Sequence, residues 1–555
     1  MIDMKWSPEN SKRMLTNLDV AIILNVSSEL SLLDKVLNTL DKAIINFLDP
    51  PLHKSIDPSY ILSDNFAPVD ELSPTECEIV HGIIPLCLDG VYIRIGPNPQ
   101  FVPNGPHHYL DGDGMVHSIR LTQGRAIFCS RYIKTNKYLF EHQAKSHIVP
   151  NVISGMQCLG PFVARVALFA ARVALGHYDI GKGIGVANTN LALFGGSLYA
   201  LCESDLPYAI QVKDNGDVIT LGQHDFNGRL SLNMTAHPKI DPVTKEAFAF
   251  RYWSTRPYMT YFYFDANGNK QPDVPILSMK KPSLTHDLAI TQKYAIICDI
   301  QLGADPMNLL HGHGLVNVDK TKVPRIGVIG RYATDDSNMK WFEVPEFNVF
   351  HVVNAWDETD EDGNDVVVLV APNILSMEHF FEQVDLIQTS MEKVTIHLGT
   401  GVVSRQTLSI DNIEFPVMNP AYVAKKNKYV YAAISEKMPI KSRMMRTIGV
   451  VKLDVTESEE YKEPYQHTVA NRMYGDNCFG GEPFFVARDP DDSNSKEDDG
   501  YVVSYVHDET TGESRFLVMD AQSPCLEVVA AVKLPQRVPY GLHGIFVTKN
   551  DLNEI

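Results

Sequence analysis

Short strand-like segments separated by turns follow one another from about residue 85 to the end of this chain. They are rich in β-branched and aromatic residues and are bounded by Gly, Pro, Asn or Asp. Because no comparably long helical pattern interrupts them, we expect an all-β core with helical additions. Repeated antiparallel strands over this length favour a β-propeller, whose blades each use about 40–50 residues. The clearest segments are GVYIRIGPNP, SLYALCES, AFAFRYWS, MTYFYFDANGN, YAIICDI, DVVVLVA, KYVYAAIS, GYVVSYVHD and RFLVMDAQS.

Two amphipathic helices are predicted outside the strand pattern. The first covers residues 12–48 and is stopped by Asp49-Pro50-Pro51; the second covers residues 160–176. We therefore expect an N-terminal amphipathic helical segment at 1–50, followed by a propeller at 51–555 that carries the second helix as an insertion.

These helices have two interpretations. Each can pack on the body of the protein, or its apolar side can dip into a lipid surface, and the presence of two favours peripheral membrane association. No apolar run approaches the roughly 20 residues of a spanning helix. The residues expected to contact a membrane are Leu33, Leu37, Leu40, Ile44, Phe162 and Phe169.

The charge balance excludes one class of partner. The formal net charge is −19, and no long basic tract is present. Nucleic-acid binding is therefore not expected.

Four histidines, scattered from position 237 to position 543, are the candidate metal ligands: His237, His286, His351 and His543. Each lies at the beginning of an expected strand, beside an apolar residue, Pro or Gly. Neutral imidazole is a common metal ligand, and an all-nitrogen site suits a redox-active transition metal. Ligands this dispersed can meet only in a convergent fold, and the inner strands of propeller blades point toward a common axis.

Two histidine clusters compete with this choice. His107-His108 and His311-Gly-His313 lie in glycine-rich loops, where we expect adjacent imidazoles to face solvent. Taken alone, any one of the 19 histidines is more often a structural or surface residue than a metal ligand.

Three glutamates in apolar segments complete the candidate site: Glu203, Glu414 and Glu482. An unpartnered carboxylate is costly in such surroundings, and metal-binding histidines usually donate their second N–H to a carboxylate or carbonyl. These glutamates therefore fit as partners of the histidines, although glutamates at exposed strand edges are the alternative.

At these residues the sequence resembles the carotenoid cleavage dioxygenase family in its plant form, including nine-cis-epoxycarotenoid dioxygenases, plastoglobule-type enzymes and zaxinone synthase. The resemblance extends over almost the whole chain from about residue 50, and its motifs occur in order. They are NFAPVDEL, VYIRIGPNPQ, PHHYLDGDGMVHS, ESDLPYAI, MTAHPKIDPVTKE, SLTHDLAIT, RYATDDSNMKWFEVP, NAWDE, GEPFFV and VPYGLHGIFV.

The resemblance implies a seven-bladed β-propeller with an α-helical dome over the iron site. It implies one non-haem Fe(II) per chain, bound by the four histidines, three of which are oriented by Glu203, Glu414 and Glu482. It further implies that O2 cleaves a conjugated double bond of a carotenoid or apocarotenoid, zaxinone-synthase-like cleavage of an apocarotenoid being one form. Phe350 and Phe415, next to a ligand and a glutamate, are the candidates for holding the polyene.

The same resemblance implies residence in the plastid at a membrane surface, although no transit peptide is evident in this chain. Two alternatives stay open. One is a related iron enzyme that isomerises its substrate or cleaves a stilbene; the other is a propeller that binds carotenoids without turnover. No Ser-His-Asp set, P-loop or dinucleotide-binding fingerprint competes within the sequence.

Overall fold

The computed structural model describes residues 32–49, 51–103, 105–151, 153–154, 159–304, 316–379, 386–436, 446–456, 463–492 and 494–555. Predictions for residues 12–31, for the side chain of Leu33 and for His311-Gly-His313 lie outside these described residues.

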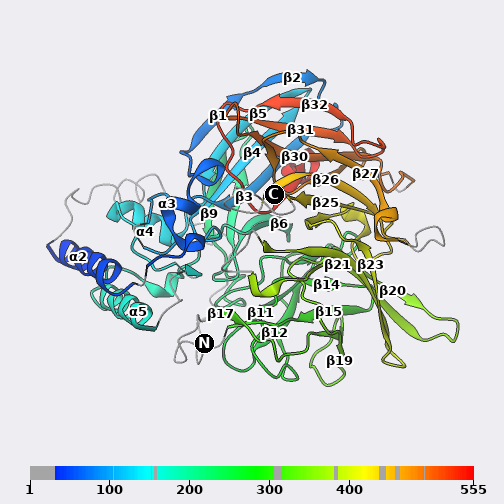
Figure 1. Ribbon diagram of the computed structural model, residues 1–555, viewed down its shortest axis with the longest axis horizontal. Helices are drawn as coiled ribbons and strands as arrows, with labels where there is room; N and C mark the ends of the chain where they lie inside the picture. The colour runs from blue at the N-terminus through cyan, green and yellow to red at the C-terminus, as the bar shows by residue number, and fades with distance from the viewer. Residues whose placement is uncertain are drawn as a thin grey trace, which may run out of the picture.

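The described chain is mostly β structure with few helices (Figure 1), as the strand pattern predicted. Four sheets contain four antiparallel strands each, taken in chain order, and a two-stranded ribbon, β16–β17, projects between two strands of one of them. All nine segments singled out in the sequence contain strands of the structure. The strands of these sheets are β6 (Asn190–Phe194), β7 (Ser197–Leu201), β8 (Tyr208–Val212) and β9 (Val218–Gln223); β10 (Lys239–Ile240), β11 (Ala247–Tyr252), β12 (Met259–Phe264) and β13 (Val274–Pro275); β14 (Leu288–Ile290), β15 (Tyr294–Asp299), β18 (Arg325–Gly330) and β19 (Lys340–Glu343), with the ribbon β16 (Leu302–Ala304) and β17 (Val316–Val318); and β20 (Asn354–Thr359), β21 (Asp365–Ile374), β22 (Thr389–His397) and β23 (Val403–Ser409).

The two remaining sheets, of five and ten strands, join the beginning of the chain to its end. In the first, β3 pairs with β33; in the second, β2 pairs with β32, both antiparallel. The five strands are β1 (Leu72–Glu76), β3 (Gly90–Pro97), β4 (Gly114–Thr122), β5 (Arg125–Tyr132) and β33 (Gly544–Thr548). The ten are β2 (Glu78–Gly82), β24 (Ile413–Val417), β25 (Tyr429–Ser435), β26 (Thr447–Asp454), β27 (Thr468–Met473), β28 (Cys478–Gly480), β29 (Phe484–Ala487), β30 (Gly500–Asp508), β31 (Glu513–Asp520) and β32 (Val528–Lys533).

The core lies between the sheets, and β21 shows how the sequence specifies this. Its run DVVVLVAPNI is buried on both faces. Val367 and Leu369 join the apolar cluster of the β15–β18 sheet, while Val366 and Val368 join the cluster of β25 and β26 on the other side. Because alternate side chains of a strand point to opposite faces, a continuous apolar run is what a sheet packed between two others requires.

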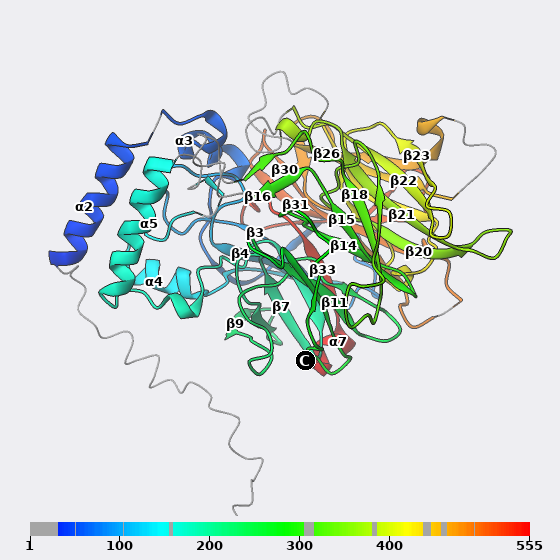
Figure 2. The same ribbon diagram turned by 90° about the horizontal axis from the view of Figure 1, so that it is seen from below.

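The helices α2 to α5 gather at one side of the molecule, where α2 and α5 lie next to each other at its edge, whereas α7 contacts β33 and β3 (Figure 2). The second predicted helix is confirmed with bounds close to those expected, and the first is confirmed over Leu32–Phe47, the part of 12–48 that lies within the described residues up to the predicted Asp-Pro-Pro stop. The helices are α2 (Leu32–Phe47), α3 (Pro58–Ile61), α4 (Asn136–Ala144), α5 (Leu159–Ala174) and α7 (Lys549–Glu554).

The pairing of α2 with α5 corrects part of the expected membrane face. Leu37 and Ile44 are buried against Leu168 of α5, so they face the partner helix rather than a lipid surface. Phe169 packs its ring on Tyr178 at 5.3 Å, and Phe162 is half-buried. Leu40, by contrast, is 49% exposed.

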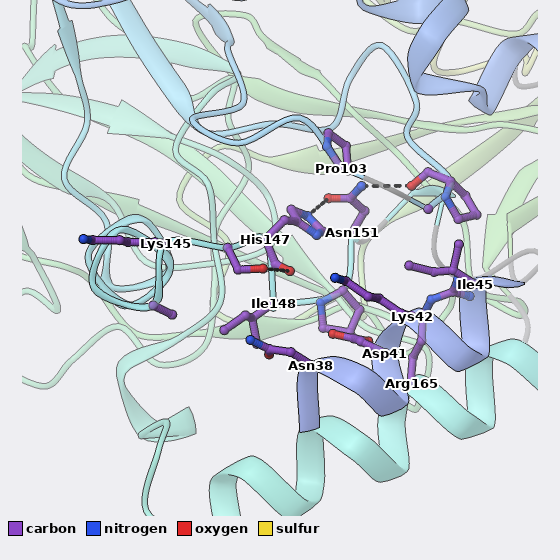
Figure 3. A pocket seen from close by; sticks show the side chains of 15 residues that line it. Asn38, Asp41, Lys42, Ile45, Pro103, Lys145, His147, Ile148, Asn151 and Arg165 are labelled. Atoms are coloured by element: carbon purple, nitrogen blue, oxygen red, sulfur yellow. Dashed lines mark hydrogen bonds between the residues drawn. The ribbon is translucent and has the colours of Figure 1, made fainter. Parts of the chain in front are cut away.

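The arginines of α5 also face α2, because Arg165 forms an ion pair with Asp49, and Arg172 forms one with Asp41. A cavity of about 240 Å³ lies between this helix pair and the loops around Pro103 and His147 (Figure 3). Among the described residues, no helix combines the length and the hydropathy needed to cross a membrane.

Candidate metal centre

Each of the four predicted ligands lies just before a strand at the edge of its sheet. His237 precedes β10, His286 precedes β14, His351 precedes β20, and His543 precedes β33. The sequence thus places one imidazole at the start of each of four strands that are far apart along the chain.

The structure brings these four histidines together. Their candidate ligand atoms all lie within 4.8 Å of one another. The Nε2 atoms of His237 and His286 are 2.8 Å apart, and the ring centroids of His351 and His543 are 4.8 Å apart. Three of the rings are buried and His286 is nearly so.

Three of the four imidazole rings have their Nδ1 atom next to the carboxylate of a predicted glutamate. His351 Nδ1 lies 2.7 Å from Glu414 Oε2, and His543 Nδ1 lies 2.8 Å from Glu482 Oε1. His286 Nδ1 lies 2.5 Å from Glu203 Oε1. A proton held on Nδ1 by a carboxylate leaves the lone pair on Nε2, and the carboxylate also fixes the plane of the ring.

His237 is the ring without a carboxylate, and its Nδ1 lies 3.4 Å from the side-chain amide of Asn190. Its position is instead set by the backbone, since His237 N–H donates to Thr235 Oγ1, and that hydroxyl donates to the carbonyl of His286. Thr235 therefore connects the first two ligand loops directly.

Burial favours the neutral form of His237 and His351, which is the form that binds a metal ion. It lowers the pKa of His237 well below its usual value, and the neighbouring histidines lower the pKa further. Burial also lowers the pKa of His351, although the carboxylate of Glu414 opposes that shift.

The donor set fits a divalent transition-metal ion. Imidazole nitrogens bind such ions at about 2.0–2.1 Å, so ligands of one ion lie about 3–4 Å apart, a spacing that the cluster approaches. The Nε2 atom of His351 is buried and makes no hydrogen bond, although such atoms are normally paired. A bound metal ion would provide the partner that this nitrogen lacks.

Phe350 and Phe415, the two phenylalanines chosen from the sequence, both contact the cluster. The ring of Phe350 stacks on His286 at a centroid distance of 3.9 Å. Phe415 lies 5.4 Å from His351 and 5.5 Å from His543. They form an apolar wall beside the imidazoles.

Sequence reasoning missed Asp287, the residue after the second ligand. This buried carboxylate forms an ion pair with Lys239 at 2.8 Å and accepts a hydrogen bond from Val352 N–H at 2.8 Å. It therefore connects the loops that carry His237, His286 and His351. In the sequence, this residue is marked only as an aspartate that directly follows a candidate ligand. The sequence alone does not distinguish such an aspartate from one in a solvated turn.

The expectation that His107 and His108 face solvent was wrong, because they are 1% and 0% exposed. The turn that contains them folds inward around Asp111, whose carboxylate accepts hydrogen bonds from the backbone N–H groups of His108, Ile153 and Ser154. Neither belongs to the four-histidine cluster.

Comparisons with known proteins agree with this architecture. The family model described as retinal pigment epithelial membrane protein matches residues 66–548. The chain is 55% identical over 532 residues to a probable chloroplastic carotenoid cleavage dioxygenase 4 of Arabidopsis thaliana, covering 95% of this chain and 87% of that protein. It is 52% identical to the chloroplastic 9-cis-epoxycarotenoid dioxygenase NCED1 of Oryza sativa subsp. japonica, covering 93% and 80%.

Solved structures give the same result for the fold. A lignostilbene dioxygenase of Pseudomonas brassicacearum is similar with a TM-score of 0.73 at 22% identity, covering 90% of this chain and all of that one. The cobalt-substituted ACO of Synechocystis is similar with a TM-score of 0.69 at 24% identity, covering 89% of this chain and 100% of that one.

Proposed function

Because this chain belongs to the carotenoid cleavage dioxygenase family, we propose that it holds one Fe(II) at the four-histidine site and uses O2 to cleave a conjugated double bond of a carotenoid or apocarotenoid into two carbonyl products. The observation that carries this proposal is the convergence of four histidines, three of them backed by carboxylates. When bound, Fe(II) supplies the redox chemistry that allows O2 to react with an alkene.

The roles of the protein's own residues follow from their contacts. Glu203, Glu414 and Glu482 keep a proton on Nδ1 of their histidines, so that Nε2 is available to the metal. Phe350 and Phe415 provide an apolar surface on which a polyene lies beside the site. No protein nucleophile or general base is needed, because the cleavage of C=C by O2 into two C=O groups transfers no proton.

The test is incubation of the iron-loaded protein with a panel of carotenoids and apocarotenals, with the products identified by mass. Carotenoids are tested before apocarotenals, because the names of the two plant relatives describe them as dioxygenases of carotenoids. Cleavage of the apocarotenals in the panel tests the prediction of a zaxinone-synthase-like activity. His351→Ala is expected to abolish cleavage, whereas His81→Ala, at an exposed position, is the matched control. Cleavage by the His351→Ala variant at the wild-type rate would refute the proposal.

Labelled O2 separates this activity from the alternatives. A dioxygenase places label in both carbonyl products, an isomerase places none, and a carotenoid-binding propeller gives no product and does not depend on the histidines. A stilbene oxygenase would cleave stilbenes in place of polyenes.

We also propose that the sheets close into a seven-bladed propeller at 51–555, with a helical dome over the iron site and the segment 1–50 as an addition. The ten-stranded sheet would then supply two blades. The antiparallel pairing of β2 with β32 and of β3 with β33 supports this closure, because a ring requires strands from both chain ends to share sheets.

For its location we propose the plastid and a peripheral membrane surface. The names of both plant relatives include "chloroplastic". Leu40, together with the exposed Phe47, Val163 and Val166, forms the apolar surface of α2 and α5 that would meet lipid. Vesicle flotation tests this: Leu40→Glu/Phe47→Glu is expected to release the protein from vesicles without loss of iron, and unchanged flotation would refute it.

A further inference from the structure

Arg94, on β3, is a fully buried arginine in an unusual environment. It is 2% exposed, and none of the ion pairs of the described residues includes it. Its Nη2 donates to the carbonyl of Pro539, its Nε makes no hydrogen bond, and its guanidinium lies 5.2 Å from the ring of Tyr505. A buried charge normally needs an acidic partner. Arg331, equally buried, has one in Asp241.

Two glycines make room for this guanidinium. A β-carbon placed on Gly481 would lie 2.9 Å from Arg94 Nη1, and one placed on Gly541 would lie 2.8 Å from Arg94 Nε. Gly481 directly precedes Glu482, and Gly541 lies shortly before His543. The side chain of Arg94 thus fits between the two segments that carry this carboxylate and this ligand.

The backbone of β3 holds the same segments. Ile95 N–H donates to the carbonyl of His543, and Leu542 N–H donates to the carbonyl of Ile95, each at 2.9 Å. Gly544, which pairs with Arg94 across β3 and β33, donates its N–H to Glu482 Oε2 at 2.8 Å.

The charge of this carboxylate also acts on Arg94. Burial lowers the pKa of Arg94, and the negative charge of Glu482 is among the groups that oppose this shift. The nearby Tyr92 hydroxyl is buried without a hydrogen bond. The charge of Glu482 raises its pKa, and the charge of Arg94 lowers it. The opposite charges of Arg94 and Glu482 therefore attract one another, although the two side chains form no direct ion pair.

We propose that Arg94 is a positioning residue for the metal site, which holds Glu482 and His543 in place and provides the positive charge that faces Glu482. This inference rests on the proposed function, because it assumes that the four histidines bind a metal. Loss of this support would let the Glu482 carboxylate and the His543 ring turn, so that Nε2 no longer points at the ion.

The test measures binding of Co(II), followed by visible absorption, in purified apoprotein. Arg94→Met keeps much of the side-chain volume and removes the charge, and it is expected to weaken Co(II) binding about 10-fold and to change the spectrum, as loss of an outer partner of a ligand typically does. Arg94→Lys, which retains the charge, is expected to recover part of the affinity. Arg331→Met is the matched control: it lowers thermal stability but leaves Co(II) affinity unchanged.

A double-mutant cycle then tests the path of the effect. If Arg94 acts through Glu482, Arg94→Met changes Co(II) affinity less than about twofold in a Glu482→Gln background. An equal loss in both backgrounds, or an Arg331→Met effect as large as that of Arg94→Met, would overturn the inference. If the wild-type protein bound no Co(II), the proposed metal site itself would fall, and the inference with it.

Discussion

The two carboxylates Glu414 and Glu482 accept hydrogen bonds differently, and this difference gives a sharp prediction. Glu414 uses one oxygen, Oε2, for both His351 Nδ1 and Phe415 N–H, each at 2.7 Å. Glu482 uses both oxygens, Oε1 for His543 Nδ1 and Oε2 for Gly544 N–H, each at 2.8 Å.

Glutamine has a single acceptor oxygen, so it can replace Glu414 but not Glu482. In Glu414→Gln the amide oxygen satisfies both donors, and the loss is that of charge assistance, about 1 kcal/mol or roughly fivefold in metal affinity. In Glu482→Gln one of two buried donors faces the NH2 group. An unsatisfied buried donor costs a further 1–3 kcal/mol or so, roughly five- to 150-fold more.

Competition with a chelator measures the metal affinity of each variant, and Glu361→Gln, at an exposed position, serves as control. We expect the order wild type, Glu414→Gln, Glu482→Gln from tightest to weakest. Equal losses in the two buried variants would refute the reasoning, since they would show that charge and not the number of acceptors determines the effect.

Three further predictions concern other parts of the structure. Chelation of a metal present at 100 times its Kd should lower the unfolding free energy by about 2.7 kcal/mol, seen as a lower Tm that His351→Ala does not share. Burial lowers the pKa of His107 to about 4. The imidazole of the unfolded chain binds a proton below about pH 6.5, whereas the folded protein does not bind it until about pH 4. The contribution of His107 to stability is therefore complete above about pH 6.5 and falls toward about pH 4, by up to about 1.4 kcal/mol per pH unit. His107→Asn should flatten the dependence of Tm on pH, whereas His81→Asn should not. Gly541→Ala should weaken Co(II) binding because its β-carbon collides with Arg94; unchanged binding would contradict the close fit.

The site was more predictable from sequence than its surroundings. The four histidines and three glutamates could be chosen because imidazoles at strand starts and carboxylates in apolar runs have few low-energy uses other than one another. The strands could be predicted equally well, because apolar runs such as that of β21 are long and regular.

Features that depend on tertiary partners could not be read in the same way. The amphipathic pattern of α2 indicates an apolar face, but not that Leu37 and Ile44 are covered by α5. The glycine-rich context of His107 and His108 is typical of an exposed turn, and only Asp111, through its backbone contacts, folds that turn inward. Asp287 and Arg94 act through residues distant in sequence, so no local pattern marks them.

The pairing of β33 with β3 sets an order of events during folding. His543 directly precedes β33, and the paired residues Arg94 and Gly544 are 450 positions apart along the chain. A contact between residues so distant in sequence requires closure of a long loop before the contact can stabilise it. A folding intermediate in which β33 has not yet paired with β3 can therefore hold at most three of the four imidazoles in place, and full metal affinity is acquired only when these two strands meet.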